Sequence, residues 1–405
     1  MHWRRNLYAV TAASFIGFTG FTLVMPFLPL YFELLGLTDV GEIALWSGFS
    51  LGVTPAITAF MAPLWGRLAD RYGRKIMVQR SLVSFVVVMA AMAFVTEPWH
   101  VFALRAVQGL FAGYGALTLT MAADSAPPAH TAYAIGFVQT AQRLGPALGP
   151  VIGGVVAQAV GLRNAFFVTA SFYLFAVVVV TLAYDERGVL KRDAAAEPSG
   201  RITFRNVLAF ENFILLMVVI FGLQFVDRSF GPILPLFVGA LGTPDAQVPL
   251  QAGILFSLSA GAGAFGNHLC GRLMDRGGPR GVIATACAVA GGGVAGFLIA
   301  GSAWWLALPT VVFGVAIGTA TTASYTAASG VIPPGARGAG FGLLTTASLV
   351  GLAVSPVVSG LLGATSLRAV FLMDGLMLGA LALLVSRLMI TSAAPLTAAP
   401  PTEER

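Results

Sequence analysis

The segment Gly66-Arg67-Leu68-Ala69-Asp70-Arg71-Tyr72-Gly73-Arg74-Lys75 decides the fold, because this charged loop stands between two long apolar runs. A related segment, Gly271-Arg272-Leu273-Met274-Asp275-Arg276-Gly277-Gly278-Pro279-Arg280, returns 205 residues later in the same setting. Similarity at a fixed offset indicates that one structural unit occurs twice. The sequence therefore predicts two related halves, each with a charged loop at the same place.

Three further matches lie at nearly the same offset. Pro26-Phe27-Leu28-Pro29-Leu30 returns as Pro232-Ile233-Leu234-Pro235-Leu236. The other matched residues are Gly145, Pro150, Gly154 and Arg163, which return as Gly351, Pro356, Gly360 and Arg368. Four matches at one offset are hard to obtain by chance, so the duplication covers most of the chain.

The composition places the chain in a lipid bilayer. Hydrophobic residues make up 57% and charged residues 10% of the 405 residues, and the mean hydropathy is +0.85. A soluble domain carries about 25% charged residues. The net charge of +6 does not indicate a nucleic-acid partner, because no run of basic residues with interleaved aromatics forms a binding face.

A membrane span needs about 20 mostly apolar residues. Twelve segments meet this length, near 7–31, 45–65, 76–95, 99–121, 131–157, 164–184, 211–237, 250–270, 281–300, 303–328, 336–362 and 367–389. We predict an all-α membrane protein with twelve transmembrane helices in two pseudo-symmetric six-helix bundles, a parallel repeat whose axis follows the membrane normal. The predicted parts are bundles at 1–184 and 211–390, a cytoplasmic linker at 185–210 and a disordered cytoplasmic tail at 391–405.

The basic residues orient the chain. The outer loops keep Arg163 and Arg368, and three arginines lie inside spans, which leaves 18 of the 23 basic residues on the side of the N-terminus. Positive charge marks the cytoplasmic side, so both termini are expected in the cytoplasm. Cys270 and Cys287 then lie toward the reducing side and are expected as free thiols. The first apolar run is too long for a cleaved signal and reads as a retained span.

Three motifs resemble signatures of a known family. The first is the loop at 66–75, the second is Arg105-Ala106-Val107-Gln108-Gly109, and the third is the glycine- and proline-rich stretch at 145–154. Together they resemble the major facilitator superfamily, and within it the twelve-helix drug:proton antiporters of MdtG-like multidrug-exporter type. The third motif fits the pattern G-x-x-x-G-P-x-x-G-G, which separates exporters from nutrient symporters. The resemblance implies the bacterial inner membrane.

The resemblance implies a conformational gate at the first loop. Its expected members are Gly66, Asp70, Arg71, Gly73, Arg74 and Asp124. Asp70 would cap the N-terminus of the eleventh span across the domain boundary and latch the outward-facing state, since a helix dipole favours a carboxylate there. The other reading is that the loop charges, including Arg71, only hold it on the cytoplasmic side. In the second copy Pro279 replaces a donor, so Asp275 is a weaker candidate.

The glycine- and proline-rich motif predicts close helix packing. Gly145, Gly149 and Gly153 recur every four residues and form one stripe, which allows close approach of a neighbouring helix. Pro150 leaves a carbonyl unpaired and can bend the helix, and Gly154 completes the motif. We expect this stripe to pack on the other half and to seal the pore against proton leak.

Charged side chains inside apolar spans are functional by default. The predicted proton-coupling and cavity group consists of Arg105, Gln108, Asp227, Arg228 and Glu33. Asp227 leads as proton carrier, because burial raises and a nearby arginine lowers the pKa of a carboxyl group. Adjacent residues point about 100° apart on a helix, so we expect that Asp227 and Arg228 do not simply neutralise each other and that one of them finds a partner elsewhere. For Asp374 we expect a structural ion pair.

The expected substrate pocket is aromatic, with Phe15, Phe18, Phe21, Met25, Gln224 and Tyr325 as its members. The family resemblance makes spans 1, 4, 7 and 10 the cavity walls. These features predict a proton-coupled antiporter that exports lipophilic or cationic drugs as a monomer, driven by the proton gradient without a cofactor or metal. A dedicated exporter of one sugar or amino acid stays open. An enzyme would need a nucleophile–base pair or a metal triad within the spans. H-E-x-x-H is absent, and the G-x-S-x-G match at 48–52 lies inside an apolar span and not at a strand-to-helix turn. A receptor or scaffold would not need the buried charges.

Overall fold

The computed structural model describes residues 2–127, 130–185, 210–333 and 337–390. Every regular element in these ranges is a helix. The first half contains α1 (His2–Leu23), α2 (Leu28–Leu34), α3 (Val40–Tyr72), α4 (Arg74–Met92), α5 (Pro98–Phe111), α6 (Tyr114–Ser125), α7 (Thr131–Val160) and α8 (Leu162–Ala183). The second half contains α10 (Phe213–Ala240), α11 (Val248–Leu298), α12 (Ala307–Val331), α13 (Arg337–Gly363) and α14 (Leu367–Leu388), with short 3-10 turns at Asp245–Gln247 and Ala303–Leu306.

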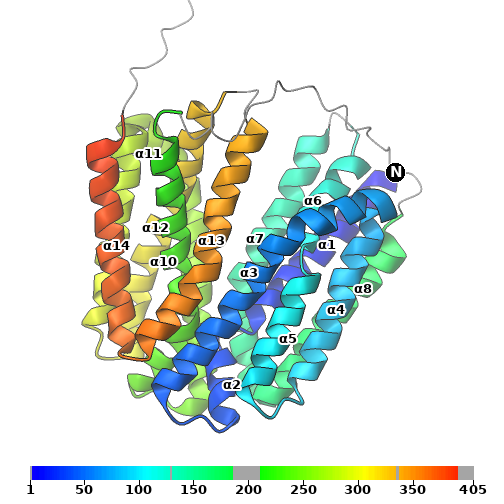
Figure 1. Ribbon diagram of the computed structural model, residues 1–405, viewed down its shortest axis with the longest axis horizontal. Helices are drawn as coiled ribbons and strands as arrows, with labels where there is room; N and C mark the ends of the chain where they lie inside the picture. The colour runs from blue at the N-terminus through cyan, green and yellow to red at the C-terminus, as the bar shows by residue number, and fades with distance from the viewer. Residues whose placement is uncertain (1, 128–129, 186–209, 334–336, 391–405) are drawn as a thin grey trace, which may run out of the picture.

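The helices supply twelve spans. Ten segments are long and apolar enough to cross a bilayer. One of them, Asp245–Leu298, holds two spans, because the backbone at Gly278 is not helical (φ 63°, ψ 170°) and Pro279 follows. α7 adds the twelfth span, and its glutamines and Arg143 lower its hydropathy. Figure 1 shows the two bundles side by side, so the predicted all-α fold of twelve helices in two six-helix bundles is confirmed.

The fourth span is broken, which the sequence did not lead us to expect. α5 ends at Phe111, and Gly113 has a left-handed φ of 117° before α6 begins. Freed carbonyls inside a bilayer need partners. Trp65 Nε1 donates to the oxygen of Leu110 (2.7 Å), and Arg80 Nη2 donates to that of Phe111 (2.9 Å). The Arg80 guanidinium also lies 3.3 Å from the centre of the Trp65 ring. Arg80 therefore stabilises this break as well as adding loop charge.

The first seam between the bundles joins α3 to α13. A Cβ added to Gly48 would lie 2.3 Å from the oxygen of Pro356, and one added to Gly360 would lie 2.6 Å from that of Ala44. Backbones approach this closely because the helices present glycines to each other. Figure 1 shows α3 and α13 meeting toward the end of the molecule where α2 lies.

The second seam joins α7 to α11 and is the repeat-related copy of the first. A Cβ on Gly154 would lie 2.4 Å from the oxygen of Pro249, and one on Gly253 would lie 2.3 Å from that of Pro150. The Val151 amide donates to Ser257 Oγ (3.1 Å). Gly48 and Gly253 are 205 residues apart, so the offset found in the sequence also relates the seams.

Several predictions concern residues outside the described ranges. Residues 186–209 of the expected linker and the expected tail at 391–405 are among these, so the domain boundaries stay predictions. The thiol prediction is confirmed, because Cys270 and Cys287 are free and buried.

Candidate functional site

A cavity of about 840 Å³ lies between the bundles. Such a volume suits a drug-sized molecule. Five of the six predicted pocket residues line it: Phe18, Phe21, Met25, Gln224 and Tyr325. Its lining continues to Thr326 and Ser329 in the last turns of α12. The bundles separate toward the end of the molecule where the N-terminus lies (Figure 1). The cavity is thus closed by the seams at one end and extends toward the other.

The two walls differ in chemistry. The wall from α1 and α7 carries aromatic rings and the prolines Pro146 and Pro150. The wall from α12 carries hydroxyl groups, among them Thr321 and Thr322. Thr321 donates to the oxygen of Ile317 (2.8 Å) and Thr322 to Asn267 Oδ1 (2.9 Å). Since those protons are used within the protein, the oxygens are left as acceptors. Aromatic rings lie on both walls, because Phe313 and Tyr325 of α12 also line the cavity, and α12 adds hydroxyl groups to them.

Asp227 and Arg228 lie on α10 and line the cavity. We expected that they would not neutralise each other, and that expectation is wrong: Arg228 Nε lies 3.3 Å from Asp227 Oδ2. The long arginine side chain folds back along the helix, which compensates for the 100° between the two Cβ directions. About a third of each side chain is exposed, so the pair faces the space where a substrate would bind.

The cavity carries more positive than negative charge. Arg143 on α7 also lines it, and no ion pair of Arg143 occurs in the part of the chain that the structure describes. Two arginines and one aspartate therefore face this space. This net positive charge is opposite to what the cationic substrates that we expected from the sequence would need.

Replacing Arg143 by glutamine is expected to weaken binding of an anionic lipophilic dye and to leave a neutral dye unaffected. A partly exposed charge pair contributes up to about 1 kcal/mol, which is about fivefold in Kd. Dye titration by fluorescence on the purified protein measures it. Arg387→Gln removes the same charge from an exposed position on α14 and is the matched control. Equal Kd values for the anionic dye in wild type and Arg143→Gln would contradict the assignment.

Arg105 and Gln108 do not line the cavity, contrary to our expectation. Arg105 is 2% exposed inside the first bundle, where Nη1 donates to Gln108 Oε1 (2.8 Å). The Thr54 hydroxyl on α3 donates to the Arg105 carbonyl (2.8 Å). The fourth span packs tightly on α3 here, which turns both polar side chains into the bundle. None of the described residues of α5 and α6 lines the cavity, whereas α7 and α11 do.

Two other predicted residues lie elsewhere. Glu33 is exposed on the last turn of α2 and does not line the cavity. Phe15 is also absent from the lining, although the next turn of α1 places Phe18 in it.

The glycine stripe of α7 packs within its own bundle, so the predicted contact of this stripe with the other half is wrong. A Cβ on Gly149 would lie 2.7 Å from the oxygen of Thr19, and one on Gly153 would fall onto the Leu23 carbonyl of α1. Pro150 and Gly154 share a different stripe, four residues apart, and that stripe forms the seam with α11. The motif therefore serves two neighbours, with three glycines facing α1 and Pro150 and Gly154 facing the other half.

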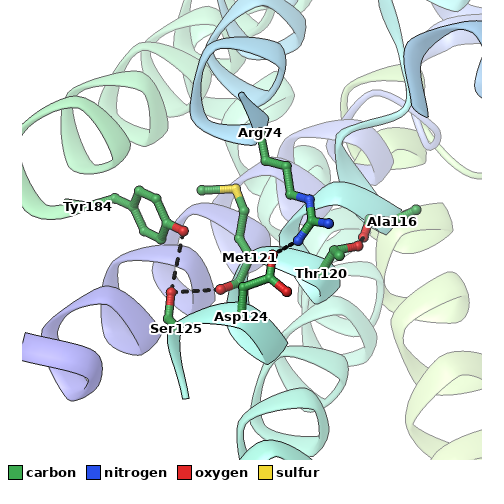
Figure 2. A network of polar contacts seen from close by, with 7 residues as sticks. All are labelled: Arg74, Ala116, Thr120, Met121, Asp124, Ser125 and Tyr184. Atoms are coloured by element: carbon green, nitrogen blue, oxygen red, sulfur yellow. Dashed lines mark hydrogen bonds and ion pairs between the residues drawn. The ribbon is translucent and has the colours of Figure 1, made fainter. Parts of the chain in front are cut away.

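The charged loop holds a polar network within the first bundle. Gly73 turns the chain from α3 into α4 with φ 98°, and Arg74 at the start of α4 pairs with Asp124 on the last turn of α6 (Figure 2). Ser125 Oγ donates to the carbonyl oxygen of Met121 (2.7 Å) and lies 3.3 Å from the Tyr184 hydroxyl, which can donate to it. The expected contact between Arg74 and Asp124 is present. The Asp70 side chain lies outside the described part of the structure, so the latch stays a prediction.

The other residues of the charged loop lie outside the Arg74–Asp124 pair. Arg71 is exposed and its guanidinium lies 5.3 Å from the centre of the Tyr72 ring. Gly66 has no atom within 4 Å of an added Cβ. The adjacent Lys75 donates from Nζ to the oxygens of Thr181 (3.0 Å) and Tyr184 (2.6 Å), which caps the end of α8.

Replacing Asp124 by asparagine is expected to slow transport about tenfold, equivalent to ~1.4 kcal/mol, because Arg74 loses its charged partner where both side chains are mostly buried. Initial rates in proteoliposomes measure it. Arg74→Gln and the double variant complete a double-mutant cycle. Additive effects of the two changes would show that the pair does not act as a unit.

Comparison with known proteins agrees with this architecture. The sequence model described as Major Facilitator Superfamily matches residues 10–348 and 249–405. The chain belongs to the Major Facilitator Superfamily. It is 34% identical over 281 residues to multidrug resistance protein MdtG of Proteus mirabilis, which covers 68% of this chain and 69% of that protein. It is also 34% identical to MdtG of Escherichia fergusonii over 69% of this chain and 68% of the relative.

Solved structures of transporters share the fold. A bacterial homologue of the human lysosomal transporter Spinster, in an inward-facing and occupied conformation, superposes with a TM-score of 0.78 at 18% identity over 94% of this chain and 96% of that one. A variant of the nucleoside transporter NupG gives 0.72 at 16% identity over 94% and 100%. This superfamily chain is a multi-pass membrane transporter related to MdtG.

Proposed function

We propose that this transporter is a proton-coupled antiporter that exports lipophilic compounds from the cytoplasm by alternating access. It would act as a monomer in a bacterial inner membrane, with both termini in the cytoplasm. The observation that carries the proposal is the cavity between the bundles, closed at one end by two glycine seams. With the N-terminus inside, the closed end is the outer one, and this conformation faces inward.

The lining supports a lipophilic substrate. Aromatic side chains such as Phe18, Phe21 and Phe313 cover much of it, and aromatic surface binds apolar rings without demanding one shape. The 34%-identical relatives are named multidrug resistance proteins, which supports drugs as the substrate class. The charge balance favours neutral and anionic drugs.

Proton coupling is assigned to Asp227, with Arg228 as its partner. A proton and a substrate that donates a hydrogen bond to the Asp227 carboxylate would occupy the same oxygen atoms, so the binding of one disfavours the binding of the other. Competition of this kind links substrate and proton in opposite directions. No cofactor is needed, because the proton gradient supplies the free energy.

Dye efflux from bacterial cells tests the proposal. Cells that express the chain are loaded with neutral, anionic and cationic lipophilic dyes and then supplied with an energy source. We expect faster efflux of neutral and anionic dyes than in cells with an empty vector, and its loss when an uncoupler is added. Efflux that persists with the uncoupler would contradict proton coupling. Transport of one sugar or amino acid without any dye would favour a dedicated metabolite exporter.

A further inference from the structure

A buried acid lies behind the cavity wall in the second bundle. Asp374 on α14 has no exposed surface, and its Oδ2 lies 2.5 Å from the Oγ of Ser229 on α10. Its other oxygen, Oδ1, has no hydrogen-bond partner among the described residues. We expected a structural ion pair for Asp374, and this expectation is wrong for the described part of the chain, whose ion pairs do not include it.

The helices around Asp374 offer no facing cation in their described parts. α14 packs on α10, α11 and α13. The charged or titratable residues of these helices include Asp227, Arg228, Cys287, Arg280 and Arg368. The others are His268, Cys270, Arg272, Asp275 and Arg276, which precede Arg280 on α11, Arg387, which follows Ser386 on α14, and Arg337, the first residue of α13. Asp227 and Arg228 face the cavity, and Cys287 is a buried thiol. Arg280 reaches α14 at Ser386, about 18 Å along the helix from Asp374. Arg368 lies six residues away, on a different face. An unpaired carboxylate in such surroundings costs several kcal/mol.

The hydrogen bonds of Ser229 indicate the protonation state of Asp374. Ser229 Oγ also lies 2.8 Å from the carbonyl oxygen of Val226. A hydroxyl has one proton to donate, so it cannot donate to both oxygens. Both contacts are hydrogen bonds when Asp374 carries a proton and donates it to Ser229, which donates to Val226.

We propose that Asp374 binds a proton in this conformation and is a second proton-exchange group of the transporter, behind Asp227. This inference rests on the proposed proton coupling. The two acids flank one helix: Asp227 is paired and faces the cavity, while Asp374 is neutral and faces Ser229. Environments that hold two carboxyl groups in opposite protonation states suit groups that exchange protons at different steps.

α10 connects the two acids. Asp227, Arg228 and Ser229 are consecutive, so the first two face the cavity and the third faces α14. Pro232 has no amide proton, which removes the helical partner of the Arg228 carbonyl. The helix is weakened beside Ser229. A change in α10 when the substrate disturbs the Asp227–Arg228 pair therefore separates Ser229 from Asp374 and allows the proton to leave.

The first test replaces Asp374 by asparagine, which mimics the neutral acid and still donates to Ser229. In proteoliposomes we expect substrate counterflow without a gradient to stay near the wild-type rate, and accumulation driven by a pH gradient to fall to the level of protein-free vesicles. We also expect infrared spectroscopy of the wild type to show the C=O stretch of a protonated carboxyl that Asp374→Asn lacks. Gradient-driven accumulation at the wild-type level in Asp374→Asn, or the same carboxyl band in both proteins, would overturn the inference.

A second variant covers the case in which Asp374→Asn does not fold. Ser229→Ala removes only a hydroxyl group, the one that accepts the hydrogen bond from the protonated Asp374 carboxyl. We expect the protonated-carboxyl band to shift in this variant, and an unshifted band would overturn the inference. A wild type that shows the carboxyl band but no gradient-driven accumulation would overturn the proposed proton coupling instead, so the two failures are distinguishable.

Discussion

Gly154→Leu is expected to abolish export while the protein stays folded. The new Cβ would lie 2.4 Å from the Pro249 oxygen and 2.7 Å from the Leu250 Cα, so two backbones of different bundles must separate. Overpacking of this kind costs about 1–3 kcal/mol. Because the contact exists only when the outer end is closed, this cost displaces the equilibrium toward the outward-facing state by roughly 5- to 150-fold.

Cysteine labelling measures this displacement. A Ser257→Cys reporter lies in the same seam, where its wild-type hydroxyl accepts from the Val151 amide. We expect Gly154→Leu to raise labelling of this reporter by an impermeant maleimide added outside. Gly292→Leu is the matched control, because Gly292 is exposed on a span and an added Cβ meets nothing within 4 Å. Unchanged labelling and transport in Gly154→Leu would mean that this seam does not open during transport.

Asp227→Asn is expected to remove proton-driven export and to keep substrate binding. The asparagine cannot exchange a proton, and Arg228 loses the partner that lies 3.3 Å away. We expect gradient-driven accumulation in proteoliposomes to fall to the passive level. The freed arginine is expected to bind an anionic dye up to about fivefold more tightly, since a pair exposed to this degree contributes up to about 1 kcal/mol.

Asp245→Asn is the control for this change. Asp245 is an exposed acid in the short turn before α11, and its replacement removes the same charge outside the cavity. We expect wild-type accumulation and dye affinity in this control. If Asp227→Asn keeps gradient-driven accumulation, coupling belongs to another acid.

The repeat in the sequence predicted the fold, because such a repeat is recognised from local signals. Three such signals can be read from the sequence without knowing which helices pack together. They are the length of the apolar runs, the position of the charged loops, and the offset that relates Pro150 and Gly154 to Pro356 and Gly360. The offset of the charged loop, 205 residues, also relates Gly48 to Gly253, which our sequence reasoning missed although a search at that spacing would have found them. The break at Gly113 was missed because its carbonyls are satisfied by Trp65 and Arg80 from other helices.

The site was predicted less completely, because side-chain direction depends on packing between helices. Phe18, Phe21 and Met25 line the cavity, as we predicted from their position in the first span. Arg105 shares the residue type and depth expected of a cavity charge, and only its packing on Gln108 and α3 turns it inward. We expected a structural role for Asp374, because its hydrogen bond with Ser229 of α10 cannot be predicted from the sequence. Periodicity identifies the face of a helix, whereas the neighbour of that face follows from tertiary structure.

Substrate-driven proton movement is the most direct test of antiport. Purified transporter is reconstituted in vesicles with a pH indicator in the lumen and no imposed gradient, and a neutral lipophilic substrate is added outside. Antiport predicts that substrate entry drives protons out, so the lumen becomes more alkaline in wild type and stays unchanged in Asp227→Asn. Substrate entry without a change in lumenal pH, or with acidification, would contradict proton antiport.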